Sequence, residues 1–210
     1  MFDSEDRVTA RKKFEDRRVR RTRTLLQNAL TSLMIEKGYE SITVQEIIER
    51  ADVGRATFYA HFADKRTLLT SRLEDLRALL LRQQREVAAA SGNAGRALSF
   101  SRAMLEHASA SLPVWRALAG RESGAFVLAR IHEMLVELVR NDLVALGLTQ
   151  RGQEREALVQ YLTGGFIALM MWWLSDGAKL SVEEVDSRFG KLAMQGIAPF
   201  ISTPRYRGER

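Results

Sequence analysis

The sequence has no cysteine, and it has only three prolines and fourteen glycines among 210 residues. Without cysteine there is no disulfide, no thiolate ligand for zinc and no cysteine nucleophile, and nothing indicates an oxidising compartment. So few prolines and glycines exclude a collagen-like chain and argue against a β-rich protein built from tight turns. The charged N-terminal segment lacks the apolar run of a signal peptide. We therefore expect a mostly helical, cytoplasmic protein.

One stretch of nineteen residues, Ala157 to Ser175, has no charged side chain. Its length approaches the roughly 20 residues that span a bilayer. Gln160 and Thr163 dilute it, and its flanks show no topology signal. A helix that is apolar all round is equally expected inside a bundle or an interface, so we predict no membrane span.

Positive charge is concentrated near the start of the chain. Nine Lys or Arg residues and only two acids, Glu15 and Asp16, lie between Arg7 and Arg23. This density suits a phosphate backbone or an anionic lipid surface, although a solvated arm has the same composition.

Four helices are predicted in the first part of the chain. The first has apolar residues in pairs every four positions and ends at Gly38, after which Tyr39 is placed to make a capping contact. Its predicted buried face comprises Leu25, Leu26, Ala29, Leu30, Leu33 and Met34.

The second helix begins with a capping box, Thr43-Val-Gln-Glu46, and its inward face is Val44, Ile47, Ile48 and Ala51. A tight turn, 52–54 with Val53 buried, leads to a short third helix from about Arg55 to His61. Asp64 is a good N-cap for a fourth helix with a leucine stripe, which runs to about Val87.

Small residues from Ala88 to Gly95 form the one clear break in composition, and we expect a second helical region to begin there. The sequence shows no internal repeat and no strand-like alternation. Further helices are predicted at about Arg96–Ser111, Pro113–Leu118, Gly124–Leu146, Gln153–Ser175 and Val182–Phe200.

Two short helices joined by a tight turn and preceded by a basic arm form the layout of a helix-turn-helix DNA reader. The residues that carry this layout are Thr43-x3-Ile47-x3-Ala51-x-Val53-x3-Thr57-Phe58-Tyr59-x-His61-Phe62-x-Asp64-Lys65-x2-Leu68. This pattern resembles the N-terminal domain of the tetracycline-repressor (TetR) family over about residues 18–69. The family often has Gly, Ser and Gly where Asp52, Gly54 and Ala56 stand here, so the third helix lacks a serine cap.

The resemblance implies an all-α protein with two domains. Residues 1–66 would form the basic arm and a three-helix helix-turn-helix domain, and residues 67–210 a helical bundle for effector binding and dimerisation. The implied function is a transcriptional regulator, more often a repressor, that binds a palindromic operator in double-stranded DNA as a homodimer. A small-molecule effector would release the DNA.

The resemblance also assigns candidate DNA contacts. Thr43 would offer its N–H and hydroxyl to a phosphate, although it is equally able to serve only as a cap, and Lys65 would add a charged phosphate contact unless it is merely solvated. Tyr59 and His61 resemble phosphate-contacting positions. The residues expected to face base edges or to add contacts from the basic arm are Arg55, Ala56, Thr57, Ala60, Arg21 and Arg23.

The second region is expected to dimerise through its last two helices, with a protomer core as the alternative. The expected dimer residues are Tyr161, Gly164, Gly165, Ala168, Leu169, Val182, Val185, Phe189, Leu192, Gly196, Ile197 and Phe200. An apolar effector pocket is expected among Phe100, Met104, His107, Trp115, Phe126, His132, Phe166, Met170 and Trp173, residues that also suit a plain core.

An enzyme is not expected, because the sequence offers no catalytic constellation. His107 and His132 have no metal-ligand spacing to each other or to a carboxylate cluster, so we predict no metal and no cofactor. A helical adaptor that binds only proteins is the alternative class. Phosphate contacts would give DNA binding a steep salt dependence, which an adaptor would lack.

Overall fold

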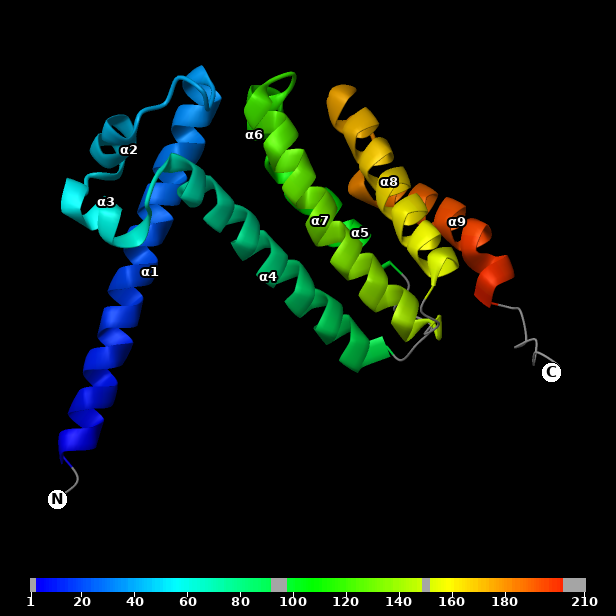
Figure 1. Cartoon of the computed structure of the whole chain (residues 1–210), viewed down its shortest axis with the longest axis horizontal. Helices are drawn as coiled ribbons and strands as arrows, with labels where there is room; N and C mark the ends of the chain where they lie inside the picture. Colours follow the sequence, from blue (N-terminus) through cyan, green and yellow to red (C-terminus); the bar gives the residue numbers. More distant parts are fainter. Residues whose placement is uncertain (1–2, 92–97, 149–151, 202–210) are drawn as a thin grey trace. The chain divides into compact units, whose positions relative to one another are not determined.

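The computed structural model describes residues 3–91, 98–148 and 152–201, and these residues form helices and connections without a strand (Figure 1). The chain divides into two compact units, residues 1–74 with 116–119, and residues 75–115 with 120–210. The predicted all-α class is confirmed. The domain limits predicted from the sequence, 1–66 and 67–210, remain a prediction. The helices are α1 (Asp3–Lys37), α2 (Val44–Ala51), α3 (Arg55–His61), α4 (Lys65–Ser91), α5 (Phe100–Ala110), α6 (Leu112–Leu118), α7 (Glu122–Ala145), α8 (Gln153–Ser175) and α9 (Val182–Ile201).

Helix α1 ends where the sequence predicts. Gly38 has φ +80°, a left-handed conformation that suits glycine, and its N–H donates to the Met34 carbonyl at 3.0 Å. The predicted apolar face of α1 is buried except for Leu25, which is exposed. Leu25 lies at the edge of that face, where the pairwise pattern alone does not distinguish core from surface. The helix continues past α2 and α3 toward its N-terminus (Figure 1).

The helix-turn-helix is organised by local hydrogen bonds. The capping box of Thr43 and Glu46 is present at the start of α2. Asp52 ends α2 with a left-handed φ of 52°, so the tight turn forms as predicted. Val53 is half-buried rather than buried, because the turn leaves one side of its side chain open.

Helix α3 has the predicted limits, and no side chain caps its start at Gly54. At the start of α4, the Asp64 carboxylate accepts from the Thr67 N–H at 2.7 Å, as expected for an N-cap. Helix α4 continues to Ser91, so the small residues after Val87 extend it by about one turn. The rest of the predicted composition break, 92–95, lies outside the described residues.

In the second unit the helices occur in the predicted order, with shifted ends. Helix α5 begins at Phe100 rather than near Arg96, because Leu98 has a left-handed φ of 61°. Three aromatic rings, those of Phe100, Phe166 and Phe189, pack together in the core of the second unit. The ring centroids of Phe166 lie 5.2 Å from Phe100 and 4.9 Å from Phe189, both in edge-on geometry.

Polar contacts join α4 to α7 within the second unit. Arg77 forms a two-pronged ion pair with Glu137 at 2.7 and 2.8 Å. Gln84, which is buried, donates to the Asp142 carboxylate at 2.7 Å and to the Leu138 carbonyl at 2.9 Å. Buried hydrogen bonds of this kind fix the register of one helix on another, because a shift would leave polar groups without partners.

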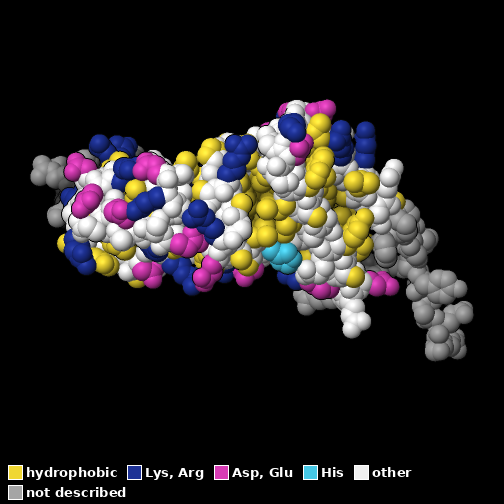
Figure 2. Space-filling view, turned by 90° about the horizontal axis from the view of Figure 1, so that it is seen from above, with side chains coloured by type: hydrophobic (Ala, Val, Ile, Leu, Met, Phe, Trp, Pro, Cys, Tyr) yellow, Lys and Arg dark blue, Asp and Glu magenta, His cyan; other side chains and the backbone are white. Residues whose placement is uncertain are grey.

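Helix α8 is long and apolar enough to cross a membrane by length and composition, and 44% of its most apolar window is buried inside the protein. A core helix of a soluble protein passes the same test. Its apolar residues divide between the core and the surface. Hydrophobic side chains gather on the face formed by helices of the second unit (Figure 2).

Candidate nucleic-acid interface

Helix α3 presents one polar and accessible face to solvent. Arg55, Ala56, Tyr59 and Ala60 are exposed and lie at spacings that share this face. The Arg55 guanidinium lies 5.3 Å from the centroid of the Tyr59 ring. The opposite face is fixed by Phe58, which is fully buried. The helix is therefore anchored on one side and open along the other.

Two further candidates lie at the margin of this face. Thr57 and His61 are half-buried. The His61 ring lies 6.3 Å from the ring of Phe62, which is itself buried. Both side chains are therefore less accessible to a ligand than those of Arg55 and Tyr59.

At the start of α2, the donors of Thr43 are aimed at a carboxylate. The Thr43 N–H and its hydroxyl each donate to Glu46 Oε2 at 2.8 Å. Glu46 also pairs with Lys37. The hydrogen bond from Lys37, followed by the bond from the Thr43 backbone, lowers the pKa of Glu46 to about 2. The Glu46 carboxylate thus already occupies both donors of Thr43 at this helix end, as expected of a cap. A phosphate contact by Thr43 stays a prediction.

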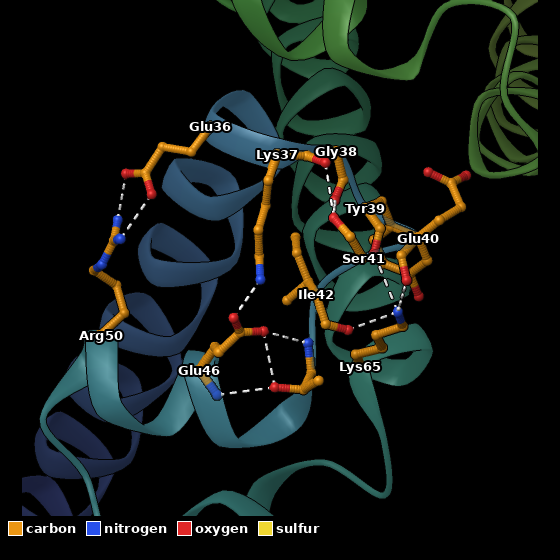
Figure 3. A network of polar contacts seen from close by, with 11 residues as sticks. Glu36, Lys37, Gly38, Tyr39, Glu40, Ser41, Ile42, Glu46, Arg50 and Lys65 are labelled. Atoms are coloured by element: carbon orange, nitrogen blue, oxygen red, sulfur yellow. Dashed lines mark hydrogen bonds and ion pairs between the residues drawn. The ribbon is translucent and has the colours of Figure 1, made fainter.

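A second ion pair joins α2 to α1. Arg50 donates through both terminal nitrogens to Glu36, at 2.6 and 2.7 Å (Figure 3). Arg50 also donates to the Ser32 hydroxyl at 2.7 Å. The hydrogen bond from Arg50 lowers the pKa of Glu36. The sequence does not predict this ion pair, although Glu36 and Arg50 each lie in the last turn of a predicted helix.

The side chain of Lys65 turns toward the loop between α1 and α2. Its ammonium donates to three backbone carbonyls, those of Tyr39, Glu40 and Ile42, at 3.1, 3.2 and 2.8 Å (Figure 3). The sequence predicts a phosphate contact for Lys65, and it gives no signal for this set of acceptors.

The described part of the basic segment is helical. Arg17, Arg18 and Arg21 are exposed on α1, and Arg23 is half-buried. The side chains of residues 7–16 lie outside the described residues. The Arg23 guanidinium lies over the Phe62 ring, which brings the segment beside the end of α3.

The candidate effector residues of the second unit fall into two groups. Five are fully or almost fully buried, namely Phe100, Met104, Phe166, Met170 and Trp173. The other four, His107, Trp115, Phe126 and His132, are half-buried. The structure brings Phe100 and Phe166 into direct ring contact, which is the packing expected of a core. An effector role for these residues stays a prediction.

The candidate dimer residues also divide. On α8, Tyr161 is 56% exposed, Gly164, Gly165 and Ala168 are also exposed, and Leu169 is half-buried. Trp172, which the sequence does not predict as a dimer residue, is 50% exposed on the same helix. On α9, Val185, Phe189 and Ile197 are instead buried within the protomer, so for these residues the core alternative holds. Phe200 has no described side chain.

The described residues contain no group of three or more His, Cys, Asp or Glu side chains that would hold a metal ion.

Comparisons with known proteins agree with this geometry. Residues 27–71 match the family model "Bacterial regulatory proteins, tetR family". The chain is 43% identical over 60 residues to the uncharacterized HTH-type transcriptional regulator YxbF of Bacillus subtilis (strain 168), a match that covers 28% of this chain and 16% of that protein. The chain therefore spans only a small part of this curated relative.

Solved structures resemble almost the whole chain. A TetR transcriptional regulator from Streptococcus agalactiae 2603V is 28% identical, with a TM-score of 0.62 over 87% of this chain and 98% of that one. A putative TetR-family regulator from Syntrophomonas wolfei is 18% identical, with a TM-score of 0.68 over 89% and 98%. The matched family consists of regulatory proteins rather than enzymes, as the sequence predicts. The resemblance of the sequence to the tetR family of bacterial regulatory proteins is confirmed.

Proposed function

We propose that the protein is a cytoplasmic DNA-binding transcriptional regulator, more specifically a repressor, that binds a palindromic operator as a homodimer and releases it when a small molecule binds the second unit. The observation that carries the proposal is the open face of α3. Arg55 and Tyr59 project from a short helix whose other side is anchored by buried Phe58. A rigidly held helix with a polar outer face is suited to enter the major groove.

In this proposal some residues of α3 contact bases and others contact phosphates. Arg55 is placed to donate two hydrogen bonds to a guanine, and Ala56 and Thr57 to contact a thymine methyl. Ala60 completes the same face. Tyr59, His61 and Thr43 contact phosphates, which fix the register of the protein on the duplex without reading sequence. Arg21 and Arg23 add phosphate contacts from α1.

One short helix makes few base contacts, so we propose that the protein binds DNA as a dimer, in which the second copy supplies a second recognition helix. Half-sites about 34 Å apart, one turn of DNA, would then match two copies. An exposed stripe on α8 supports dimerisation, and it consists of Tyr161, Gly164, Gly165, Ala168 and Trp172. Leu192 of α9, which is 62% exposed, adds apolar area to this surface.

For the effector, the half-buried aromatic and histidine residues are better placed than the packed rings. His107, Trp115, Phe126 and His132 retain accessible surface, and an apolar lining with a few polar groups suits a flat hydrophobic ligand. In this proposal the five fully buried residues would form the rest of the lining.

The proposal is tested by selecting duplexes from a random pool with the purified protein and then measuring affinity at several salt concentrations. We expect a palindromic consensus, and a steep fall in affinity with salt for random duplex as well as for the selected site. Failure to enrich any sequence, together with salt-independent binding, would contradict the proposal and favour a protein-binding adaptor.

A further inference from the structure

Thr163 lies in the middle of α8, on its buried face. Its side chain is fully buried, as are those of Val159 and Phe166, which lie one turn away on either side. The hydroxyl of Thr163 has no hydrogen-bond partner among the residues that the structure describes. A buried hydroxyl without a partner costs free energy, because it has given up its hydrogen bonds with water. An apolar side chain of the same shape would avoid this cost.

Hydroxyl groups on other helices are satisfied locally. Thr24 and Thr31 on α1 each donate to the backbone carbonyl four residues earlier, at 3.0 and 2.9 Å. In the second unit, the buried hydroxyl of Ser101 donates to the Leu98 carbonyl at 2.8 Å. Thr163 makes no bond of this kind within the described residues, so its hydroxyl is available to a partner that does not belong to the protein.

The face of α8 that carries Thr163 also carries two candidate effector residues. Phe166 and Met170 follow it by three and seven positions, and both are fully buried. The ring of Phe166 makes edge-on contacts with Phe100 of α5 and Phe189 of α9. The unpartnered hydroxyl therefore lies one helical turn from an aromatic cluster to which three helices contribute.

The residues of this face restrict the ligands that suit it. Aromatic rings in edge-on clusters pack favourably with a further ring. Residues Ala157 to Ser175 include no charged side chain, so a charged ligand would find no opposite charge on this part of α8 and would be costly to bury. A threonine hydroxyl both donates and accepts hydrogen bonds. A neutral aromatic molecule with a hydroxyl group meets all of these conditions.

We propose that Thr163 is the hydrogen-bonding residue for the effector, and that the effector is a neutral aromatic compound with a hydroxyl group. The inference rests on the proposed function and narrows the chemistry of its ligand. Because Thr163, Phe166 and Met170 are closed to solvent in this structure, such a compound reaches the hydroxyl only when the second unit rearranges. The flexible side chain of Met170 allows the core to repack around it. The ligand thus favours an arrangement other than the closed one, which is what a switch requires.

The first test needs no ligand. Thr163→Val keeps the shape of the side chain and removes the hydroxyl, and we expect the variant to melt at the temperature of the parent or up to a few degrees above it. Ser101→Ala, which removes a buried hydroxyl that has a partner, is the control and should melt below the parent. A Thr163→Val protein that melts below the parent would show that the hydroxyl stabilises the fold, and would overturn the proposal.

The second test compares 2-naphthol with 2-methylnaphthalene, in which a methyl group replaces the hydroxyl. A phenolic hydroxyl has a pKa of about 10, so 2-naphthol is neutral at pH 7. Calorimetry measures both affinities for the parent, Thr163→Val and Thr163→Ser. We expect the parent to prefer 2-naphthol, and Thr163→Val to reduce the ratio of the two affinities about tenfold, because one hydrogen bond is lost.

Two variants serve as controls for this ratio. Thr163→Ser keeps the hydroxyl and should keep the preference of the parent. Thr31→Val makes the same chemical change at a hydroxyl that already has a partner in the first unit, and should also keep it. A parent that binds neither compound, or a ratio that is the same in Thr163→Val as in the parent, would overturn the proposal.

The selection of DNA by the parent separates this inference from the proposed function. If the parent selects no DNA, the proposed function fails, whatever the protein binds at Thr163. If the parent selects an operator, 2-naphthol should release it, and about tenfold more of the compound should be needed with Thr163→Val. If 2-naphthol binds through Thr163 and leaves the operator bound, Thr163 is not an effector residue and only this inference fails.

Discussion

The guanidinium carbon of Arg23 lies 5.2 Å from the centroid of the Phe62 ring. Phe62 is the buried residue that follows α3, and Arg23 stands at the end of the basic segment of α1. A cation over an aromatic ring contributes about 0.5–1 kcal/mol at an accessible site. This contact ties the basic segment to the residue that follows α3, so the charges of α1 near Arg23 have a defined place beside the end of α3.

Two substitutions distinguish the contribution of α1 charges to DNA binding from the contribution of the Arg23–Phe62 contact to stability. Arg21→Met removes an exposed cation, and we expect a salt slope lower by about 0.9 per phosphate contact, with an unchanged melting temperature. Arg23→Met should lower the slope similarly and also lower the melting temperature by a few degrees, because it removes the contact with Phe62. Fluorescence anisotropy and thermal melting measure the two effects. An unchanged slope in both variants would show that α1 does not contact phosphates.

Arg55→Ala should relax the sequence preference at one base pair of each half-site. A two-pronged arginine–guanine contact discriminates by about 1–3 kcal/mol against the wrong base. The measurement is a repeat of the random-pool selection with the variant. Lys179→Ala, which changes an exposed cation of the second unit, is the control and should give the parent consensus. A consensus for Arg55→Ala identical to that of the parent would remove Arg55 from the base contacts.

Acid should destabilise the first unit partly through Glu46. Its pKa is about 2 in the folded protein, below the ordinary value, so its stabilising contribution is present above pH 4.5 and is lost as the pH falls toward 2. We expect Glu46→Gln to be less stable than the parent at pH 7, and the difference to shrink between pH 4.5 and 2. Glu49→Gln, on the same helix, controls for the loss of one charge. Chemical denaturation at a series of pH values measures this, and a pH-independent difference would contradict the assignment.

The sequence was most informative where structure is local. The capping box of Thr43 and Glu46 and the limits of α3 follow from residues a few positions apart, so the pattern predicts them well. The bonds from Lys65 join positions 23 to 26 residues apart. No local pattern encodes such a contact, and the prediction for Lys65 could not include it.

The second unit shows a different limit. An apolar stripe on α9 has the same spacing whether it packs inside the protomer or against a second copy. The stripe therefore predicts a dimer contact for Phe189, whereas in the structure its ring packs on Phe166 in the core. On α8 the exposed small residues between Tyr161 and Trp172 match the expected surface, and only an assembly measurement tests its use.

Gly165→Arg should convert a dimer into monomers. In the protomer a Cβ at Gly165 would meet no atom within 4 Å, so the substitution leaves the fold intact, whereas a charge buried at an interface is costly. Gln153→Arg, in the exposed first turn of α8, is the matched control and should stay dimeric. Sedimentation at micromolar concentration distinguishes these states. A monomeric parent, or a dimeric Gly165→Arg protein, would exclude this surface.

An effector should act through α4, which spans the division between the two units at residues 74 and 75. The Arg77–Glu137 ion pair ties α4 to α7, so a ligand that fits only one arrangement of the second unit would bias the position of α4. We expect a library of hydrophobic aromatic and cationic compounds to contain members that raise the melting temperature and release the operator. Linkage requires the operator to weaken the affinity of such a ligand by the same factor.

Glu137→Gln tests this route, because it keeps the shape of the side chain and removes the charge. The coupling factor should fall in this variant, while operator affinity without ligand stays near that of the parent. Glu133→Gln, which loses only an exposed pair with Arg130 on the same helix, is the control and should keep the parent factor. Titrating ligand with and without operator measures the factor directly. Ligands that stabilise the protein but leave operator affinity unchanged would show that the second unit binds them without switching DNA binding.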